Sequence, residues 1–369
     1  MRSVPANEPL GNRLEPGVSD PASDLALYDY HLPKELVAQQ PLPNRSDARL
    51  LVLSRRQGGV EHRHVRDLPQ LLRPGDVLVL NNTKVIPARL VGYRERTGGF
   101  WEGLFLEQDR HGLWRLMCRT RGKLHPGEIV VLRDREGQEW LKLHLVCRLE
   151  DGTWAVRPDP VGPALELLQR VGRVPLPPYI RRGQMVPSDW ERYQTVYAQH
   201  AGSVAAPTAG LHFTEQLLQR LQERGIGIQY VTLHVGPGTF RPIKTQDIRQ
   251  HTMHAEWGQI TPEVVQRLQQ TRAAGGRIVA VGTTSVRVLE TAAREGTLRP
   301  WEGWTRLYIC PGFEFHATDV LMTNFHLPRS SLLVLVCAFA GRERVLAAYE
   351  EAVRERYRFY SYGDAMLIF

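Results

Sequence analysis

Hydrophobic and polar positions follow two different patterns along the chain. Between residues 75 and 157, short hydrophobic runs are separated by turn signals such as those at residues 97–99 and 151–152. Strands are predicted at residues 75–80, 84–93, 113–120, 128–134, 141–147 and 153–158. Six short strands at this spacing indicate a small closed barrel or a sandwich.

Helical and strand patterns alternate after residue 187, which is typical of an α/β layer structure. Thr214 caps a predicted helix that has Gly225 just past its end, and Thr261 caps a second helix. A third helix opens near Ser285. Buried strands are predicted between these helices, at residues 226–235 and 277–281.

The segment at residues 25–54 has a helix candidate at 33–40 and a strand at 49–54, but too few strands to close a core. We therefore expect it to join the α/β part, which makes the barrel an insertion. The predicted fold is a larger mixed α/β domain with an inserted small closed β-barrel. Its predicted parts are a flexible leader at 1–24, a discontinuous α/β domain at 25–74 and 158–369, and the barrel at 75–157.

The longest apolar run, at residues 332–340, is far shorter than the roughly 20 residues that a membrane-spanning helix needs. It indicates a buried core helix, and the apolar spacing over 342–358 indicates a surface helix. The cysteines form no CxxC pair, and the first residues have no apolar signal segment, so a cytoplasmic protein without membrane attachment is expected. No heptad pattern is evident, and a monomer is expected.

Composition narrows the function only a little. The 369 residues suggest about two domains, and 42% hydrophobic residues suffice for a folded core. Lys and Arg outnumber Asp and Glu by 47 to 39, a formal net charge of +8. This excess is compatible with a polyanionic partner and equally with a solvated basic surface. The most concentrated basic residues of the predicted barrel are Arg119, Arg121 and Lys123.

Two loops that follow predicted strands have room for a ligand. Thr283, Thr284 and Ser285 begin a helix, where an anion would meet backbone N–H groups, although simple capping explains them as well. Gly236 and Gly238 allow close approach of a ligand or a tight turn. The third glycine of a dinucleotide-binding fingerprint is missing here, which excludes that interpretation.

Other polar residues stand at the starts of predicted helices. The small-residue loop that contains Ala206, Thr208 and Gly210 ends on His212, and it suits a flat ligand or a close-packed turn. Asn324 and His326 precede the apolar run, where either ligand binding or helix capping would use them.

A metal site is one alternative for the histidines. His251 and His254 are followed by Glu256, and His212 or His234 would supply a further ligand. The spacing lacks the i, i+4 geometry of the familiar zinc helix, so hydrogen-bonding or acid–base roles are favoured.

Taken together and in this order, eight segments resemble one family, the S-adenosylmethionine:tRNA ribosyltransferase-isomerases of queuosine biosynthesis. The segments run from Tyr28 to Phe369 and read YDYHLPKELVAQQPLPNRSDARLLVL, GDVLVLNNTKVIPARL, YQTVYAQHAGSVAAPTAGLHFTEQLL, LHVGPGTFRPI, HTMHAEW, VGTTSVRVLE, TNFHLPRSSLLVLVCAFAG and YSYGDAMLIF. The resemblance implies an α/β domain with an inserted barrel.

The resemblance also implies a reaction. The family transfers the ribosyl part of S-adenosylmethionine to 7-aminomethyl-7-deazaguanine at the wobble position of tRNAs with GUN anticodons. Epoxyqueuosine-tRNA forms, and adenine and methionine leave. S-adenosylmethionine is then a co-substrate, no prosthetic group or metal is implied, and tRNA is the macromolecular partner.

Motif position and this chemistry suggest roles for the candidate residues. His212, His234 and His254 suit the proton transfers. The expected substrate-binding residues are Asn81, Asn82, Thr83, Arg89, Ala206, Thr208, Gly210, Gly236, Gly238, Glu256, Thr283, Thr284, Ser285, Arg287, Asn324, His326 and Asp364. Within this set, Arg287 and the helix start would hold a carboxylate or phosphate, and Asp364 a substrate amine or hydroxyl.

Two other functions remain open at this point. In one, the barrel grips RNA and the α/β part is a scaffold without catalytic activity. In the other, the histidines bind a metal that catalyses hydrolysis.

Overall fold

The computed structural model describes residues 23–56, 59–240 and 243–369. Nearly all of the predicted leader at 1–24 lies outside the described residues. No helix in the described ranges combines the length and the apolar character needed to cross a membrane.

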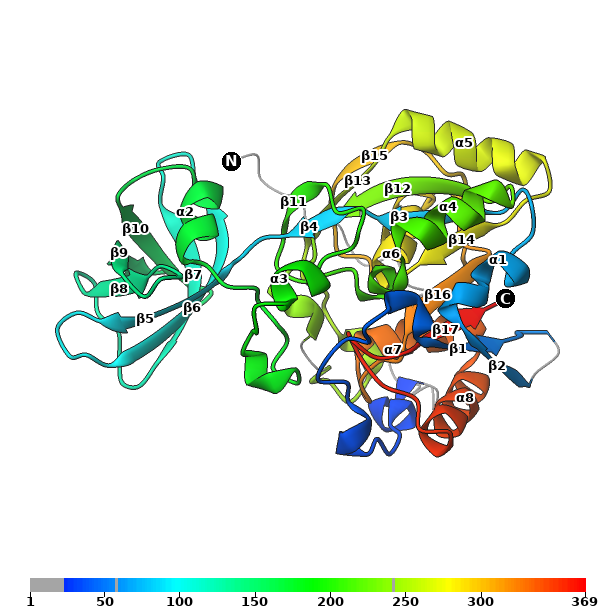
Figure 1. Cartoon of the computed structure of the whole chain (residues 1–369), viewed down its shortest axis with the longest axis horizontal. Helices are drawn as coiled ribbons and strands as arrows, with labels where there is room; N and C mark the ends of the chain where they lie inside the picture. The colour runs from blue at the N-terminus through cyan, green and yellow to red at the C-terminus, as the bar shows by residue number, and fades with distance from the viewer. Residues whose placement is uncertain (1–22, 57–58, 241–242) are drawn as a thin grey trace.

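A mixed sheet, nine-stranded over the described residues, forms the larger part of the protein (Figure 1). Its strands, in order across the sheet, are β15 (Trp301–Thr305), β13 (Glu256–Ile260), β12 (Gly227–Leu233), β3 (Val77–Asn81), β14 (Ile278–Val281), β16 (Val320–Asn324), β17 (Ala365–Ile368), β1 (Arg49–Leu53) and β2 (Val60–His64). The central strands β12, β3, β14 and β16 are parallel. Their flanking neighbours β13 and β17 run in the opposite direction.

Helices cover both faces of this sheet. On one face lie α5 (Pro262–Ala273), α6 (Thr283–Ala292), α7 (Ser331–Ala340) and α8 (Arg342–Arg354), and on the other α1 (Leu68–Leu71) and α4 (Glu215–Glu223). The central strand β3 shows why both faces are covered. Its residues Val77 and Val79 pack into the first core and Leu78 and Leu80 into the second, so all four are buried, as in other strands covered on both faces.

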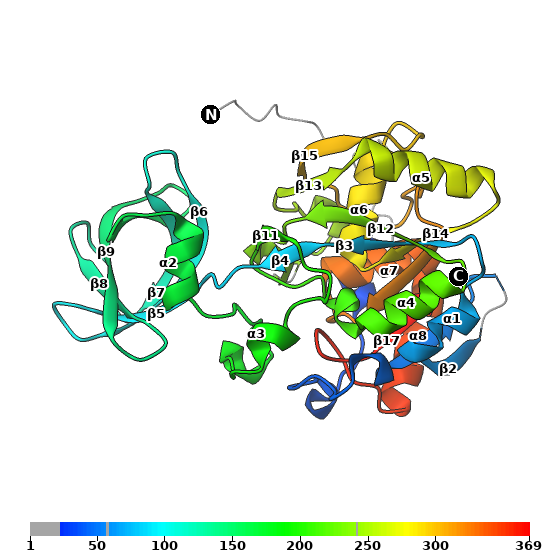
Figure 2. The ribbon, with the colours of Figure 1, turned by 45° about the horizontal axis from the view of Figure 1, so that its top comes forward.

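The smaller part of the protein is a closed barrel (Figure 2). All residues from 89 to 159 are described, and the six barrel strands in spatial order are β10 (Trp154–Asp159), β7 (Trp114–Thr120), β6 (Phe100–Gln108), β5 (Arg89–Arg94), β8 (Ile129–Arg133) and β9 (Glu139–Arg148). The helix α2 (Ala164–Val171) adds Leu167, Leu168 and Val171 to the barrel core. The barrel lies beside the large sheet, and the parallel strands β4 (Thr83–Val85) and β11 (His200–Ser203) lie between them (Figures 1 and 2).

The remaining elements are short. They are α3 (Asp189–Arg192) and 3-10 helices at Leu25–Tyr28, Lys34–Leu36, Arg45–Asp47, Val65–Asp67, Arg181–Gly183, Thr208–His212, Pro237–Phe240 and Ile248–Gln250.

The predicted fold class is confirmed, and several local predictions are wrong. The strand predicted at 75–80 is β3, which pairs with β12 and β14 in the large sheet and not in the barrel. The barrel instead contains β6, which the hydrophobic pattern missed. The limits proposed for the two domains stay a prediction.

The predicted helix at 33–40 is also wrong, because only Lys34–Leu36 forms a 3-10 turn. Beyond it the chain is extended and pairs with a distant segment: Phe359 N donates to Leu36 O at 2.8 Å, and Ala38 N donates to Phe359 O at 3.2 Å. A helix would leave these partners without their hydrogen bonds.

Candidate functional site

One edge of the large sheet gathers most of the predicted site residues. The parallel strands β12, β3, β14 and β16 end there, and the antiparallel strands β13 and β17 begin there. The residues at this edge are Asn81, Asn82, Thr83, His234, Gly236, Glu256, Thr283, Thr284, Ser285, Asn324 and Asp364. Open α/β sheets bind ligands outside the carboxyl ends of their parallel strands, so this edge is the candidate site.

The ring of His234 is held by neighbours on several sides. Its Nδ1 lies 2.8 Å from the Thr83 hydroxyl, and its ring stacks on Trp257 with centroids 5.1 Å apart. Gly202 lies so close that a Cβ there would stand 2.8 Å from the imidazole. Burial, and then His200, lower the pKa of His234, so the ring is neutral at pH 7.

Asn81 and Asn82 connect β3 to β12 instead of facing an open site. The Asn81 amide donates to Leu233 O at 3.0 Å and accepts from the Leu233 and Thr83 N–H groups. The Asn82 amide accepts from the Thr232 hydroxyl at 2.8 Å. Both side chains are buried. These hydrogen bonds fix the backbone where it leaves β3, and they thereby hold Thr83 next to His234.

Glu256 and Arg287 form an ion pair inside the protein. The side chains are 2% and 4% exposed, so the pair is almost completely shielded from water. The second carboxylate oxygen of Glu256 accepts from Gly236 N at 2.8 Å, and Nε of Arg287 donates to Leu307 O at 3.1 Å. The Glu256 carboxylate therefore ties the predicted glycine loop to α6.

The start of α6 combines a sharp turn with an unsatisfied hydroxyl. Gly282 has a φ of 86°, which glycine adopts without strain, and it turns the chain from β14 into the helix. The Ser285 hydroxyl donates to Val281 O at 2.8 Å. Thr284 Oγ1 is buried and has no hydrogen-bond partner among the described residues. Thr283 and Thr284 are both almost fully buried.

A second polar group lies at the end of β16. The Thr208 hydroxyl donates to Asn324 Oδ1 at 2.8 Å, and Asn324 Nδ2 donates to the carbonyls of Tyr360 and Asp364. This pattern fixes the orientation of the Asn324 amide. Nδ2 also lies 3.2 Å from His212 Nε2; because an amide nitrogen can only donate, this contact is a hydrogen bond when Nε2 accepts and the neutral ring carries its proton on Nδ1.

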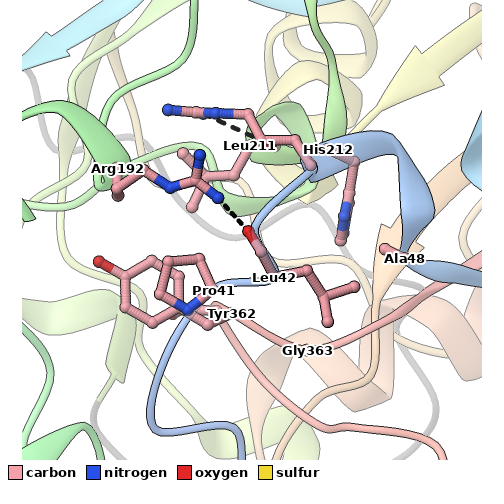
Figure 3. Close-up of a pocket in the computed structure, with 10 residues that line it drawn as sticks. Pro41, Leu42, Ala48, Arg192, Leu211, His212, Tyr362 and Gly363 are labelled. Carbon is pink, nitrogen blue, oxygen red and sulfur yellow. Dashed lines mark hydrogen bonds between the residues drawn. The ribbon is translucent and has the colours of Figure 1, made fainter. Parts of the chain in front are cut away.

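His212 lines a pocket formed by four segments of the chain. Its walls are Pro41, Leu42, Arg45, Ala48, Arg192, Leu211, His212, Ser361, Tyr362 and Gly363. Figure 3 shows His212 and Ala48 on one side and Pro41 and Tyr362 on the other. Burial, and then Arg45 and Arg358, lower the pKa of His212 to about 4, so the ring is neutral at pH 7.

Sheet order separates the two histidines. His234 follows β12 and His212 contacts the end of β16, with β3 and β14 between them. Three strand spacings place these strand ends about 14 Å apart. The structure therefore assigns His212 and His234 to different parts of the same edge.

Several predicted residues have other surroundings. His326 is buried, its Nε2 lies 2.7 Å from the Thr323 hydroxyl, and burial lowers its pKa to about 3. Asp364 accepts from the backbone N–H groups of Arg49 and Arg358, and burial raises its pKa. Both side chains are thus engaged within the protein.

The remaining predicted residues pack closely or lie at the barrel. Ala206 is buried in the hydrophobic cluster of Tyr362, and Gly210 lies directly against Tyr197. Arg89 pairs with Glu102 at 2.6 Å and also donates to Gly183 O. Its guanidinium therefore joins the first barrel strand to the segment that leaves the barrel.

The residues of the metal alternative do not converge. His254 is exposed and lies against Gly238, His251 packs edge-on against Tyr308, and Glu256 pairs with Arg287. Over the ranges that the structure describes, no three His, Cys, Asp or Glu side chains are grouped as metal ligands would be.

Arg45, Arg192 and Tyr362 line the pocket and were missed by sequence reasoning. Arg45 and Tyr362 belong to segments that carried the family resemblance, YDYHLPKELVAQQPLPNRSDARLLVL and YSYGDAMLIF. The family resemblance of these two segments was therefore the signal that could have pointed to Arg45 and Tyr362. Arg192 lies between motifs, in α3, and has no such signal.

The fold and the candidate site together define an α/β protein with an inserted barrel and a polar edge on its main sheet. The chain matches the family model described as queuosine biosynthesis protein over residues 25–368. It belongs to this family, which confirms the resemblance found in the eight segments and the prediction that the chain is an enzyme of this family.

Similar proteins support the same assignment. An S-adenosylmethionine:tRNA ribosyltransferase-isomerase from Symbiobacterium thermophilum is 51% identical over 345 residues, which are 93% of this chain and 99% of that protein. A protein of the same name from an Anaeromyxobacter species is 52% identical over 350 residues, covering 93% of this chain and 98% of the relative. The crystal structure of an S-adenosylmethionine tRNA ribosyltransferase from Thermotoga maritima is 38% identical, with a TM-score of 0.53, and the match covers 93% of this chain and 100% of that one.

Proposed function

We propose that this chain transfers and isomerises the ribosyl moiety of S-adenosylmethionine onto 7-aminomethyl-7-deazaguanine at the wobble position of a GUN-anticodon tRNA. The products are epoxyqueuosine-tRNA, adenine and methionine. The observation that carries the proposal is the identity of about half of all residues with relatives of that name over 93% of the chain. The polar sheet edge supplies the kind of residues that the reaction needs.

The reaction needs a base and an acid in a site that binds both substrates. The positive sulfur of S-adenosylmethionine acidifies the neighbouring C5′ protons, and a base that takes one of them leaves a carbanion beside the sulfur. Adenine takes a proton as its bond to the ribosyl moiety breaks, the aminomethyl nitrogen forms the new bond to that moiety and loses a proton, and methionine leaves when the C5′–sulfur bond breaks. Histidine that is neutral at pH 7 is suited to the first proton transfer.

We assign the base to His234. The Thr83 hydroxyl lies 3.5 Å from His200 O, and donation to that carbonyl leaves its oxygen free to accept the His234 Nδ1 proton. The Nε2 lone pair of His234 is then available to a substrate. The side chain is only partly buried, so a substrate can reach it. Stacking on Trp257 holds the ring in place.

The geometry supports a binding role for His212 instead. Its Nε2 accepts from Asn324, so in the neutral ring Nδ1–H is the group left to meet a substrate. With a pKa of about 4 the ring gains no proton at neutral pH and acts there as a hydrogen-bond donor. His254, exposed beside Gly238, stays a candidate for the acid.

The net charge of +8 suits a tRNA substrate, because phosphates would meet a predominantly basic protein. A wobble base is unpaired in an anticodon loop, and its edges are therefore open to recognition. In this proposal the protein works as a monomer in the cytoplasm, where its tRNA substrates are found.

The test is product formation by the purified protein. It is incubated with S-adenosylmethionine and a GUN-anticodon tRNA that carries the aminomethyl-deazaguanine, and adenine release and nucleoside mass are followed. Adenine release with a matching gain in nucleoside mass supports the proposal. Tight, salt-dependent tRNA binding without adenine release contradicts it and favours an RNA-binding scaffold.

Variants then test the roles of the histidines. His234→Ala should lower kcat by about a hundredfold or more while both substrates still bind. His212→Ala should act mainly on substrate affinity. Near-normal turnover by His234→Ala would rule out its role as the base.

A further inference from the structure

The pocket beside His212 contains two arginines that pair with no carboxylate of the described residues. Arg45 and Arg192 both line it, and both are only partly exposed. Arg45 donates to the carbonyls of Gln194, Leu211 and Glu191, and Arg192 donates to Leu42 O. Across the part of the chain that the structure describes, neither guanidinium has an ion pair with an acidic side chain.

Two acidic side chains near this pocket, those of Asp189 and Asp364, are already engaged. Asp189 pairs with Arg181 and accepts from the Tyr362 hydroxyl at 2.7 Å. Asp364 accepts from the backbone N–H groups of Arg49 and Arg358. Arg358 donates to Gln40 O, and its Nη1 is buried without a hydrogen-bond partner among the described residues. Neither of these carboxylates pairs with Arg45 or Arg192 among the residues that the structure describes, so the positive charge at the pocket has no partner there.

Such an arrangement is unfavourable in the absence of an anion. Burial, and then the nearby Arg192, lower the pKa of Arg45, which expresses the same cost of holding like charges together away from water. The backbone carbonyls fix each guanidinium in position but do not neutralise its charge. An anionic group in the pocket, which His212 also lines, would do so.

We infer that this pocket is an oxyanion-binding subsite, in which Arg45 and Arg192 receive a carboxylate or phosphodiester oxygen of a substrate. The inference rests on the proposed function, because that reaction offers two such groups. One is the carboxylate on the methionine part of S-adenosylmethionine, and the other is a phosphodiester of the tRNA. Guanidinium groups bind both through paired N–H donors.

The subsite differs from the one expected at the start of α6. There the Ser285 hydroxyl already donates to Val281 O, and Arg287 is paired with Glu256. Within the described residues, Arg45 and Arg192 have no acidic partner that an anion would have to displace. The pocket is thus the better place for the anionic part of a substrate.

Binding measurements on Arg192→Gln test the inference. Arg192 has a single bond to a backbone carbonyl, so this variant is expected to fold, whereas Arg45→Gln loses three such bonds. Arg192→Lys keeps the positive charge but loses the paired N–H donors of the guanidinium. Arg220→Gln, on the exposed face of α4, is the matched control. Thermal melting confirms the fold of each variant.

Three ligands separate the two sources of the oxyanion. They are S-adenosylmethionine, its decarboxylated analogue and the tRNA, each titrated into wild-type protein and into each variant. If the carboxylate occupies the subsite, Arg192→Gln weakens S-adenosylmethionine by about tenfold or more and leaves the decarboxylated analogue unchanged. If a phosphodiester occupies it, only tRNA binding weakens, and the slope of log affinity against log salt falls by about one.

Unchanged affinity of the folded Arg192→Gln variant for all three ligands would overturn the inference. Failure of the proposed function has a different signature, since wild-type protein would then release no adenine from S-adenosylmethionine in the presence of tRNA.

Discussion

The carboxylate of Glu256 and the guanidinium of Arg287 form an ion pair that joins the start of β13 to α6 inside the protein. One carboxylate oxygen meets the arginine, and the other accepts from Gly236 N at 2.8 Å. Nη2 of Arg287 is buried without a hydrogen-bond partner among the described residues. The pair therefore connects the loop after β12, the strand β13 and the helix that begins at the sheet edge.

Breaking this pair should destabilise the protein strongly. Replacing one partner leaves a buried charge uncompensated, so Glu256→Gln and Arg287→Met should each lower the free energy of unfolding by about 3–5 kcal/mol. The double variant should lose less than the sum of the two single variants. Denaturant unfolding of all four proteins measures this coupling, and additive losses would show that the two side chains do not depend on each other.

The buried histidines predict a stability that falls in mild acid. His212 and His326 have folded pKa values of about 4 and about 3, whereas an unfolded histidine has a pKa of about 6.5. Below about pH 6.5 these histidines become protonated in the unfolded chain but stay neutral in the folded protein. The free energy of unfolding therefore decreases as the pH falls, and it levels off below the folded pKa. Each ring should account for about 2 kcal/mol of the loss between pH 7 and pH 5.

The His326→Gln variant isolates one of these contributions. Unfolding of wild type and variant is compared at pH 7 and pH 5, and the variant should show a pH dependence smaller by about 2 kcal/mol. An identical pH dependence would mean that His326 is already protonated in the folded protein at pH 5.

The contacts around His234 predict effects on turnover from residues that hold its ring in position. A methyl group at Gly202 would lie 2.8 Å from the imidazole and would push the ring away from Thr83. Gly202→Ala and Thr83→Val should each lower kcat by about tenfold or more, because the base loses its orientation. Thr83→Ser, which keeps the hydroxyl, should retain most of the activity. Equal activity of the Val and Ser variants would contradict this positioning role.

The barrel predicts a salt-dependent contribution to tRNA binding. Arg119, Arg121 and Lys123 are exposed beside one turn of the barrel. If they meet phosphates, replacing all three by Gln should reduce the slope of log affinity against log salt by about two to three. If the triple variant binds tRNA as tightly as wild type at every salt concentration from about 50 to about 300 mM, the barrel has a purely structural role.

Local signals in the sequence were sufficient for most helices. The Thr214 hydroxyl accepts from Leu217 N at 3.1 Å and the Thr261 hydroxyl from Val264 N at 3.5 Å, so both predicted caps are confirmed. These bonds join neighbours in sequence and depend little on the rest of the fold. The helix predicted at 33–40 does not form because this segment makes backbone hydrogen bonds with Phe359 instead. Phe359 is distant in the sequence, so no local pattern predicts this pairing.

The barrel and the site depended on contacts between distant residues. The strand β6 alternates buried and exposed positions, with Trp101, Gly103 and Phe105 facing inward, and this alternation is the signal that would have found it. Motif resemblance located most residues of the sheet edge. Arg45 was missed because its partner, the backbone carbonyl of Gln194, lies 149 positions away in the sequence. A hydrogen bond to a distant carbonyl leaves no pattern of side chains in the sequence.

The contact between Arg49 N and the Asp364 carboxylate joins positions 315 residues apart, where β1 lines up beside β17. During synthesis on the ribosome, β1 therefore cannot pair with β17 until nearly all of the intervening chain has been made. The barrel strands all fall between Arg89 and Asp159, so the barrel is free to close much earlier. Contacts over such separations slow folding and prolong exposure of strand edges. We expect a newly made chain to carry a finished barrel beside an open sheet.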